Sequence, residues 1–403
     1  MNILLVTSQF FPKRTSAAIQ IRDLAQEFVR QGHSVLLVTP AEKLNLSVSS
    51  ALDVEGVKVL YLSSIRISNV GYVRRVLGEF LMPYLMYGDF KRSEYFKVSW
   101  DIVVWYSPSI FMGPFILRVR SFIKKKCTSY LILRDIFPEW ALHTGILSQG
   151  VIYRFFQRIA NHQYNQADVI GIQSPSNAKF LDHYALGDDT KIEVLENWLN
   201  TESSHKCAIQ VANTPLAGRN ILVYIGNMGV AQNIGALLDA AESLNARTDI
   251  GFLFIGRGSE VARLKEVVEA KGLINTLFYD EVPSNQLPDL LAQCKLGLVS
   301  LSLKHETHNI PGKFLTYMRE GLPVFAHINP DSDLERLIIG AQVGTTYCGS
   351  SINNLRVIIE ELLADADNYQ VMSKNALNLY RERFSPARAA NQIVYTASDH
   401  INS

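Results

Sequence analysis

The sequence predicts an α/β protein made of two Rossmann-like domains, each a parallel sheet covered by helices on both faces. The length of 403 residues is roughly two to three times that of a usual single domain. Short apolar runs alternate with helical patterns along both halves, and uninterrupted apolar runs are typical of strands buried on both faces. A polar stretch without a clear period, Thr201–Asn220, separates the halves and predicts a linker.

The first half contains short apolar runs that predict strands, with helical patterns between them. The strands are expected at Ile3–Thr7, Val35–Thr39, Val57–Tyr61, Ile102–Tyr106, Ser129–Leu133, Val169–Gln173 and Ile192–Leu195. Helices are expected at Ile19–Gln31, where apolar residues recur on one face, and at Ile152–Gln166.

The second half repeats this alternation. Its strands are expected at Ile221–Ile225, Gly251–Ile255, Leu277–Phe278, Leu296–Leu301, Pro323–Ala326 and Gly344–Tyr347. Its helices are expected at Ile234–Leu244, Glu260–Lys271, Gln286–Gln293, Lys313–Glu320, Asn353–Ala364 and Pro386–Ala397.

These patterns divide the chain into domains at residues 1–200 and 201–384, followed by a C-terminal helix at 385–403. A return of that helix to the N-terminal domain is left open. Two facing Rossmann-like domains leave a cleft between them at the carboxyl ends of both sheets, where ligands bind in open α/β folds. We therefore expect an enzyme with its site in that cleft.

Composition excludes several classes of protein. A net charge of +1 gives no electrostatic case for nucleic-acid binding. The four cysteines lie far apart without a CxxC pair, which argues against a disulfide scaffold or a cysteine zinc site and suits a reducing compartment. The N-terminus lacks the features of a signal peptide, and no apolar run reaches the roughly 18 residues of a membrane span. The expectation is a protein that is soluble or bound to a membrane from one side.

Basic residues are concentrated in the first half of the chain. Residues 1–200 carry a net charge of +5 and residues 201–403 a net charge of −4, while the window 65–126 alone carries +7. Apolar residues at i+3/i+4 spacing interleave these charges, which predicts a helix lying on an anionic bilayer. An ordinary amphipathic helix on the domain's own core is the alternative. The residues expected to contact the membrane are Arg74, Arg75, Phe80, Leu81, Tyr84, Lys91 and Arg92.

The loop after the first expected strand ends in small residues at the start of a helix. Ser16 and Ala17 there let backbone amides approach an anion, helped by the helix dipole. A plain N-cap at Thr15 or Ser16 explains the same residues. Neither GxGxxG nor GxxxxGK[ST] occurs, so a dinucleotide cofactor and a P-loop NTPase are both disfavoured.

Three loops of the second half each lead into a helix and carry glycines or a cation. They are Tyr224–Asn233, Phe254–Glu260 and Asn309–Phe314. Together these helix N-termini predict a site for a diphosphate, since unpaired amides and lysine or arginine side chains bind phosphate oxygens. In the third loop Pro311 is expected in the first turn, with the amides after it unpaired. The residues expected to bind include Gly226, Asn227, Arg257, Gly312, Lys313 and Phe314.

At these motifs the chain resembles the family-4 retaining glycosyltransferases of GT-B fold. The segments Ile225-Gly-Asn-Met-Gly, Phe254-Ile-Gly-Arg-Gly and Pro311-Gly-Lys-Phe-Leu-Thr-Tyr-Met-Arg-Glu-Gly-Leu-Pro-Val look like the donor half of that family. Arg134-Asp-Ile-Phe-Pro-Glu-Trp is similar to an element of bacterial surface-polysaccharide members, especially N-acetyl-L-fucosaminyl transferases. The resemblance covers nearly the whole chain and rests on the order and spacing of the motifs.

The resemblance implies a retaining reaction that requires no metal and no cofactor. The departing phosphate oxygen accepts the proton of the acceptor hydroxyl on the same face of the sugar. Asp135 and Glu139 are the catalytic candidates, orienting sugar hydroxyls or stabilising the oxocarbenium-like state. For Asp135, which directly follows an expected strand, a helix N-cap is the alternative role.

Some family positions hold different residues in this chain. Most members carry Arg and Lys in the first donor loop, where this sequence has Asn227 and Gln232. Most also carry two glutamates, at the places of His308 and Thr316. Glu306 is the candidate to replace the first glutamate. The remaining cations expected to meet the diphosphate are Arg257, Lys304 and Lys313.

The function expected from this resemblance is transfer of N-acetylfucosamine or a related N-acetylated hexosamine in O-antigen or capsule biosynthesis. The donor is a UDP-sugar and the acceptor an undecaprenyl-diphosphate-linked sugar, at the inner face of the cell membrane. Two alternatives stay open. One is a UDP-sugar 2-epimerase of the same fold, and the other is a non-catalytic member of a polysaccharide-assembly complex.

Overall fold

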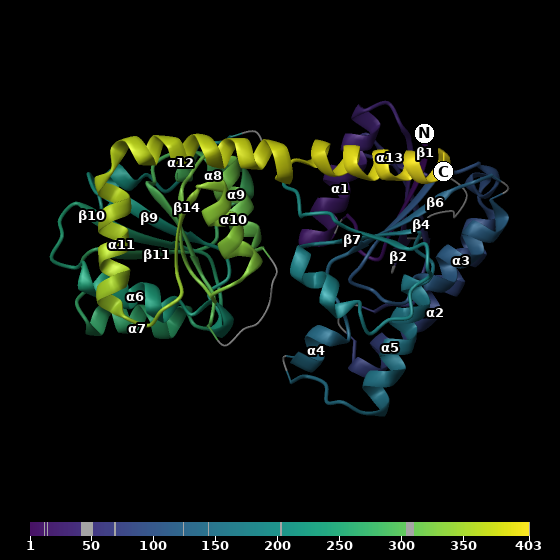
Figure 1. Cartoon of the computed structure of the whole chain (residues 1–403), viewed down its shortest axis with the longest axis horizontal. Helices are drawn as coiled ribbons and strands as arrows, with labels where there is room; N and C mark the ends of the chain where they lie inside the picture. The colour runs from purple at the N-terminus through teal and green to yellow at the C-terminus, as the bar shows by residue number, and fades with distance from the viewer. Residues whose placement is uncertain are drawn as a thin grey trace. The chain divides into compact units, whose positions relative to one another are not determined.

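The computed structural model describes residues 1–11, 13, 15–41, 51–67, 70–123, 125–143, 145–201, 204–303 and 310–402. The chain divides into two units, which Figure 1 shows with their elements labelled. Residues Met1–Trp198 and Pro386–Ser403 form the first unit, and Leu199–Ser385 form the second. The chain therefore passes between the units twice.

The first unit is built on an eight-stranded sheet. Its strands are β1 (Asn2–Thr7), β2 (Ser34–Ala41), β3 (Leu52–Val54), β4 (Val57–Ser63), β5 (Ile102–Tyr106), β6 (Thr128–Leu133), β7 (Val169–Ile172) and β8 (Lys191–Val194). The order across the sheet is β3-β4-β2-β1-β5-β6-β7-β8, and the pairs are parallel except β3 with β4. Strand β3 was not predicted, because its three residues carry no apolar run. It pairs only with β4, to which the tight turn at Glu55 and Gly56 connects it.

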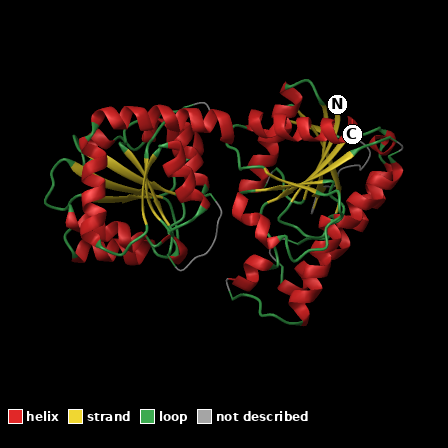
Figure 2. Cartoon of the chain, viewed as in Figure 1, coloured by secondary structure: helices red, strands yellow, loops and turns green. Residues whose placement is uncertain are grey.

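Helices cover both faces of this sheet, as Figure 2 shows. They are α1 (Ser16–Arg30), α2 (Tyr72–Arg92), α3 (Gly113–Phe122), α4 (Glu139–His143), α5 (Val151–Tyr164) and α13 (Pro386–Asn402). One apolar core joins the sheet to α1 and α13, and the other joins it to α2, α3 and α5. In α13, the alanines Ala389, Ala390 and Ala397 are buried, and these small side chains let the helix approach the sheet and α1 closely.

The second unit is built on a six-stranded parallel sheet in the order β11-β10-β9-β12-β13-β14. Its strands are β9 (Asn220–Ile225), β10 (Ile250–Ile255), β11 (Thr276–Tyr279), β12 (Leu296–Ser300), β13 (Val324–His327) and β14 (Gly344–Tyr347). Its helices are α6 (Ile234–Ser243), α7 (Val261–Ala270), α8 (Leu287–Leu291), α9 (Gly312–Arg319), α10 (Asp333–Ala341), α11 (Ile352–Ala364) and α12 (Ala366–Leu379). Two apolar cores again lie on opposite faces of the sheet.

The α/β fold with two parallel-sheet units is confirmed, and each predicted strand lies within two residues of an observed one. The predicted linker Thr201–Asn220 is wrong in one respect. Three side chains of this polar stretch, Cys207, Val211 and Leu216, are buried in the core of the second unit. Their spacing matches neither a helix nor a strand, so the sequence pattern did not show that the stretch packs on the unit.

The strand order reverses at one point in each sheet. In the first unit the reversal lies between β1 and β5, and in the second between β9 and β12. Loops leave the carboxyl ends of the two central strands in opposite directions there, which opens a crevice where ligands bind in open α/β sheets. In the second unit, Gly226 directly follows β9, and Lys313 lies at the start of α9, the next helix after β12.

Candidate active site

Tyr317 connects helix α9 to strand β9, where the strand order of the second unit reverses. Strands β9 and β12 pair only at Leu296 with Leu222 and at Gly297 with Val223. The Tyr317 hydroxyl, fully buried, accepts a hydrogen bond from the Ile225 amide at 3.1 Å and lies 3.0 Å from the carbonyl oxygen of Val223, to which it donates. A side chain at Gly297 would place its Cβ 2.5 Å from the Tyr317 ring. The start of α9 is therefore held at the carboxyl end of β9.

Lys313, the second residue of α9, lies against the loop that follows β9. Its ammonium nitrogen is 3.5 Å from the ring centroid of Tyr224, within the range of a cation–π contact. A Cβ on Gly226 would lie 3.8 Å from Cε of Lys313, so glycine leaves space in front of the lysine. Burial lowers the pKa of Lys313 to about 7. An anion placed here would favour the charged form of the lysine and would itself be stabilised.

The loops after β9 and β10 run backbone against backbone. The Gly226 amide donates to the carbonyl of Ile255, and the Met228 amide to that of Arg257, each at 2.8 Å. A Cβ on Gly256 would overlap the Gly226 carbonyl, and one on Gly258 would overlap the Met228 carbonyl. Both glycines have positive φ, 144° and 159°. Only glycine, which has no side chain, therefore allows the two loops to pack this closely at both positions.

Replacing Gly256 by alanine is expected to lower the melting temperature by more than about 4 °C, because the new Cβ meets backbone atoms that cannot move away. Gly235→Ala is the matched control. Gly235 lies in α6 with open space around it, so alanine there should leave the melting temperature unchanged or raise it. Thermal unfolding followed by circular dichroism measures both, and equal effects of the two variants would contradict the loop-packing role.

Asn227 and Gln232, which stand where most family members carry cations, form a neutral pair. The Asn227 side-chain amide donates to Oε1 of Gln232 at 2.9 Å, and the same oxygen accepts from the Gly229 amide at 3.0 Å. The Tyr224 hydroxyl donates to the Asn227 carbonyl at 2.7 Å. The pair therefore closes the loop on itself and supplies no positive charge.

The other predicted cations have different positions. The side chain of Arg257 is 84% exposed and forms an ion pair with Glu281 at 3.1 Å. Lys304 and Glu306 lie outside the described residues, as does His308. Among the predicted cations whose positions the structure describes, Lys313 is the one in contact with the first loop.

The start of α9 corrects two sequence expectations. Pro311 is the N-cap of the helix rather than a residue of its first turn, since its ψ of 140° is extended. The Phe314 amide, expected to be unpaired, donates to the Pro311 carbonyl at 3.0 Å, so it is unavailable to a ligand. Its side chain is fully buried in the core, and the Thr316 hydroxyl donates to the Gly312 carbonyl at 3.3 Å. The amides of Gly312 and Lys313 occupy the first two helical positions, which have no partner within a helix.

In the first unit, the N-terminus of α1 is capped by Thr15. Its hydroxyl accepts a hydrogen bond from the Ala18 amide at 3.3 Å and donates to the Gln9 side chain at 2.7 Å. The capping role offered by the sequence is thus observed. Ser16 and Ala17 form the first turn behind this cap, where their amides point out of the helix end.

Asp135 lies just after β6 in a pocket of about 360 Å³. The walls of the pocket are largely aromatic and aliphatic, with Phe111, Phe137 and Trp140 among them. Desolvation raises the pKa of Asp135 above its usual value, although the side chain still reaches solvent, and the charge of Arg134 opposes the increase. Asp135 does not cap α4, which begins four residues later. A carboxylate exposed in an apolar pocket is a candidate for binding or for acid–base chemistry.

The neighbouring Arg134 is buried, and its side chain does not line the Asp135 pocket. Its guanidinium donates to the carbonyls of Leu195 and Glu196 at 2.6 and 3.2 Å and lies 5.2 Å from the ring of Trp198. Arg134 thus fixes the last segment of the first unit before the chain leaves it. Its role is structural, and Asp135 alone of this pair faces the pocket.

Glu139 is not brought together with Asp135. It is buried, and its Oε1 accepts hydrogen bonds from the hydroxyls of Tyr184 and Tyr153 at 2.6 and 3.3 Å. Burial raises its pKa above the usual value for a glutamate, against the opposing effect of these hydroxyls. The walls of the Asp135 pocket do not include it. This environment suits a residue that holds α4 in place.

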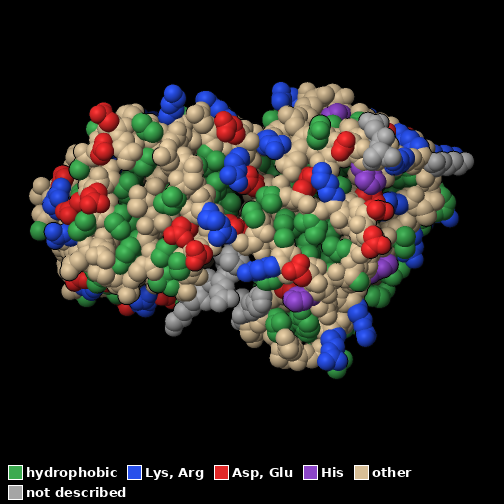
Figure 3. Space-filling model, viewed as in Figure 1, with side chains coloured by type: hydrophobic (Ala, Val, Ile, Leu, Met, Phe, Trp, Pro, Cys, Tyr) green, Lys and Arg blue, Asp and Glu red, His purple; other side chains and the backbone are tan. Residues whose placement is uncertain are grey.

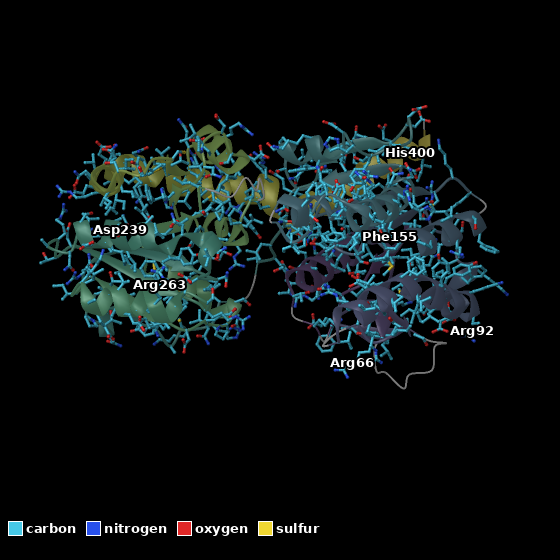
Figure 4. The ribbon with its side chains drawn as sticks, turned by 90° about the horizontal axis from the view of Figure 1, so that it is seen from below. Arg66, Arg92, Phe155, Asp239, Arg263 and His400 are labelled. Carbon is cyan, nitrogen blue, oxygen red and sulfur yellow. The ribbon has the colours of Figure 1, made fainter. Side chains whose placement is uncertain are left out.

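The residues predicted to contact a membrane lie on α2 with their side chains at the surface. Six apolar residues along one stripe of this helix are each at least 41% exposed: Val73, Leu77, Phe80, Leu81, Tyr84 and Leu85. Basic residues stand at its two ends, Arg74 and Arg75 near the start and Lys91 and Arg92 at the finish. Figure 3 shows hydrophobic side chains at the surface along this side of the first unit, and Figure 4 labels Arg92. We call the six apolar residues the α2 stripe.

Sequence reasoning missed the two tyrosines of the second-unit site. Tyr224 contacts Lys313 and the loop, and Tyr317 joins α9 to the sheet. Tyr317 falls four residues after Lys313 on the same helix, a spacing that places both on one side and is the only signal available. Across the described ranges, no cluster of His, Cys, Asp and Glu could hold a metal ion. In the same residues no helix is long and apolar enough to cross a bilayer.

Comparison with known proteins identifies the second unit. Residues 208–379 match the family model described as glycosyl transferases group 1. Comparison with curated protein sequences gives no significant match.

Solved structures resemble the whole chain. Sucrose-phosphate synthase (tll1590) from Thermosynechococcus elongatus is 15% identical with a TM-score of 0.70, and the match covers 99% of this chain and 98% of that one. HepE (Alr3699) of Anabaena, solved in complex with UDP, is 15% identical with a TM-score of 0.68 and coverages of 99% and 100%. WaaG, a glycosyltransferase involved in lipopolysaccharide biosynthesis, is 14% identical with a TM-score of 0.60 and coverages of 97% and 99%. At these identities the likeness establishes the fold. The second unit thus matches the group 1 glycosyl transferase model over residues 208–379, and the two parallel-sheet units of the chain have the GT-B fold.

Proposed function

We propose that the chain transfers N-acetylfucosamine or a related N-acetylated hexosamine from UDP to a lipid-diphosphate-linked sugar. The reaction retains the configuration of the sugar and needs no metal ion. The enzyme works as a peripheral protein on the inner face of the cell membrane, in the synthesis of O-antigen or capsule.

The observation that carries this proposal is the position of the α2 stripe beside the Asp135 pocket. Arg75, Val76 and Glu79 of α2 line that pocket, while the stripe lies on the exposed side of the same helix. A continuous exposed apolar stripe between basic helix ends is typical of a helix that lies in the membrane interface. A carboxylate pocket next to such a helix suits an acceptor whose sugar is attached to a membrane lipid.

The donor is assigned to the second unit. The glycine loop, the first two amides of α9 and Lys313 offer hydrogen-bond donors and a cation in one place, as a diphosphate requires. The similar protein HepE was solved with UDP and with UDP-glucose, which supports a uridine nucleotide as the carrier.

The chemistry follows from these groups. Charge develops on the leaving diphosphate as the sugar bond breaks, and aligned amides with a cation stabilise it. The departing phosphate oxygen takes the proton of the acceptor hydroxyl on the same face of the sugar. Asp135 orients a sugar hydroxyl or stabilises the positive charge of the transition state.

A screen of UDP-sugars by mass spectrometry tests the proposal. Each UDP-sugar is incubated with the protein alone and with a short-chain prenyl-diphosphate N-acetylglucosamine acceptor. The acceptor is expected to gain one N-acetylfucosamine or one related N-acetylated hexosamine. Formation of an epimeric UDP-sugar without acceptor would instead support the epimerase alternative, and no reaction with any sugar would support a non-catalytic member.

Removing the cation at the start of α9 should weaken donor binding. Lys313→Ala is expected to weaken UDP-sugar binding by roughly 1–3 kcal/mol, the range of a hydrogen bond to a charged group. Arg257→Ala is the matched control, because Arg257 is exposed and paired with Glu281, and its loss should change affinity by less than about 1 kcal/mol. Isothermal titration with UDP-N-acetylglucosamine measures both, and an unchanged affinity in Lys313→Ala would refute the assignment.

Donor affinity should also depend on pH through Lys313. Its pKa is about 7 in the free protein, and a bound diphosphate raises it, so the protonated form binds more tightly. Affinity is therefore full below pH 7 and falls as pH rises, by about tenfold between pH 6 and pH 8. The sugar diphosphate has no group that titrates in this range. Lys313→Arg should give a flat profile, and a wild-type profile equally flat would show that Lys313 does not meet the phosphates.

A further inference from the structure

The first unit has a second cavity beside the Asp135 pocket. This cavity of about 300 Å³ lies between α2 and α5, and we call it the α2–α5 cavity. Phe80 and Tyr84 of α2 form one wall, and Phe155 and Ile159 of α5 form another. Phe111 lines both cavities, so the two cavities are neighbours. Each is large enough for part of a small-molecule ligand.

A row of aromatic rings connects the two cavities. The centroid of Phe111 is 6.5 Å from those of Phe80 and Phe156, and both pairs meet edge to face. Phe156 lies 5.1 Å from Phe137, which lines the Asp135 pocket. An apolar wall therefore continues from the surface of α2 to the neighbourhood of Asp135.

The mouth of the α2–α5 cavity is apolar and exposed. Phe80, Tyr84 and Phe155 are 42%, 41% and 45% exposed, and the first two belong to the α2 stripe. Figure 4 labels Phe155, on α5. Because the cavity opens through the same side chains that form the stripe, an apolar chain could pass from a bilayer into it without crossing water.

The charges around this cavity suit an apolar chain with an anionic head. Its lining includes Arg158 and His162, both from α5, and no carboxylate. The Arg118 guanidinium lies 4.8 Å from the ring centroid of Tyr84, which adds a third nitrogen donor group near the mouth. One guanidinium group can donate two parallel hydrogen bonds to phosphate oxygens. A neutral sugar would instead need hydrogen-bond donors and acceptors that the aromatic walls lack.

We propose that the α2–α5 cavity binds the prenyl segment of the acceptor lipid that adjoins its diphosphate. The row of aromatic rings then guides the sugar end of the acceptor toward the Asp135 pocket. The inference rests on the proposed function in one respect, namely that the acceptor is a lipid diphosphate. It adds that the chain itself is recognised by the protein, beyond any attachment to the membrane surface.

Binding of prenyl diphosphates of different length tests this. The full chain is dialysed to equilibrium against labelled farnesyl diphosphate or isopentenyl diphosphate, below their aggregation concentrations and with saturating UDP to block the donor site. Farnesyl diphosphate is expected to bind at least tenfold more tightly than isopentenyl diphosphate, because its extra isoprene units fill the cavity. Equal affinities would overturn the proposal, since they would show that the phosphates alone are recognised.

Variants that fill the cavity provide the second arm. Ile159→Trp and Ile159→Phe each add an aromatic ring to the lining and should weaken farnesyl diphosphate binding, at least tenfold for the larger indole. Ile152→Trp is the matched control, because Ile152 is an exposed residue of α5 outside both cavity linings, and its affinity should be unchanged. Only variants that keep the wild-type melting temperature are compared. Unchanged affinity in a folded cavity variant, or equal loss in the control, would overturn the proposal.

Binding measured in this way, together with transfer assays on lipid acceptors of different chain length, separates this inference from the proposed function. If farnesyl diphosphate binds as expected while no sugar is transferred to any lipid acceptor, the cavity assignment stands and the proposed reaction fails. If sugar is transferred with a KM that does not depend on prenyl chain length, the reaction stands and the cavity assignment fails.

Discussion

Asp135→Asn is expected to lower kcat by about 10²–10³-fold, the order of magnitude lost when one group that stabilises transition-state charge is removed. The substitution keeps the shape of the side chain and removes the charge that faces the pocket. Because Asp135 belongs to the first unit and the donor loops to the second, UDP affinity should stay within about twofold of the wild type. Steady-state kinetics and isothermal titration measure the two quantities.

Glu139→Gln is the matched control for this variant. Glu139 is buried under two tyrosine hydroxyls and outside the pocket, so its substitution should lower stability by about 1–3 kcal/mol and reduce kcat far less than Asp135→Asn. If Asp135→Asn instead loses stability, UDP binding and activity together, Asp135 is a structural residue. A larger loss of kcat in folded Glu139→Gln would return the catalytic assignment to Glu139.

Replacing Arg74, Arg75, Lys91 and Arg92 by serine is expected to abolish sedimentation with anionic vesicles. Each basic residue near such a surface contributes about 1 kcal/mol, and these four stand at the ends of the α2 stripe. Transfer to a long-chain acceptor in vesicles should slow, while transfer to a water-soluble short-chain acceptor should survive. Sedimentation should also weaken in high salt, because the attraction is screened.

The control for this variant removes the same charge from the second unit. Arg263, Lys265, Arg356 and Lys374 are exposed there, and their replacement by serine should leave sedimentation unchanged. Arg75 and Arg92 also form ion pairs with Glu79 and Asp89 within α2. An equal loss of transfer on both acceptors would mean that the four residues bind the acceptor or support the fold, and the membrane role would be wrong.

The sequence predicted the sheets well because parallel strands buried on both faces are uninterrupted apolar runs. It missed β3 because an edge strand of three residues has no such run. It also interpreted Thr201–Asn220 as a linker at the start of the second domain, since scattered buried residues such as Val211 have no period. Contacts with other elements determine the structure of β3 and of Thr201–Asn220, and such contacts leave no periodic pattern in the local sequence.

The candidate site was predicted in part. The positions of Gly226 and Lys313 followed from the rule that ligands bind at the carboxyl ends of parallel strands. That the glycines after β10 serve loop packing could not be seen, because the contact is with backbone atoms far away in sequence. The burial that shifts the pKa of Lys313, and the aromatic lining of the pocket that contains Asp135, likewise depend on tertiary neighbours.

The most direct test of the proposed reaction is the mass and anomeric configuration of the acceptor lipid after incubation in anionic vesicles. The acceptor is undecaprenyl-diphosphate N-acetylglucosamine and the donor is UDP-N-acetylfucosamine or a related UDP-hexosamine. Wild-type protein is expected to add one sugar with retained configuration, and Asp135→Asn and Lys313→Ala are each expected to add it more slowly. An acceptor of unchanged mass with every UDP-sugar, or a product of inverted configuration, would contradict the proposed reaction.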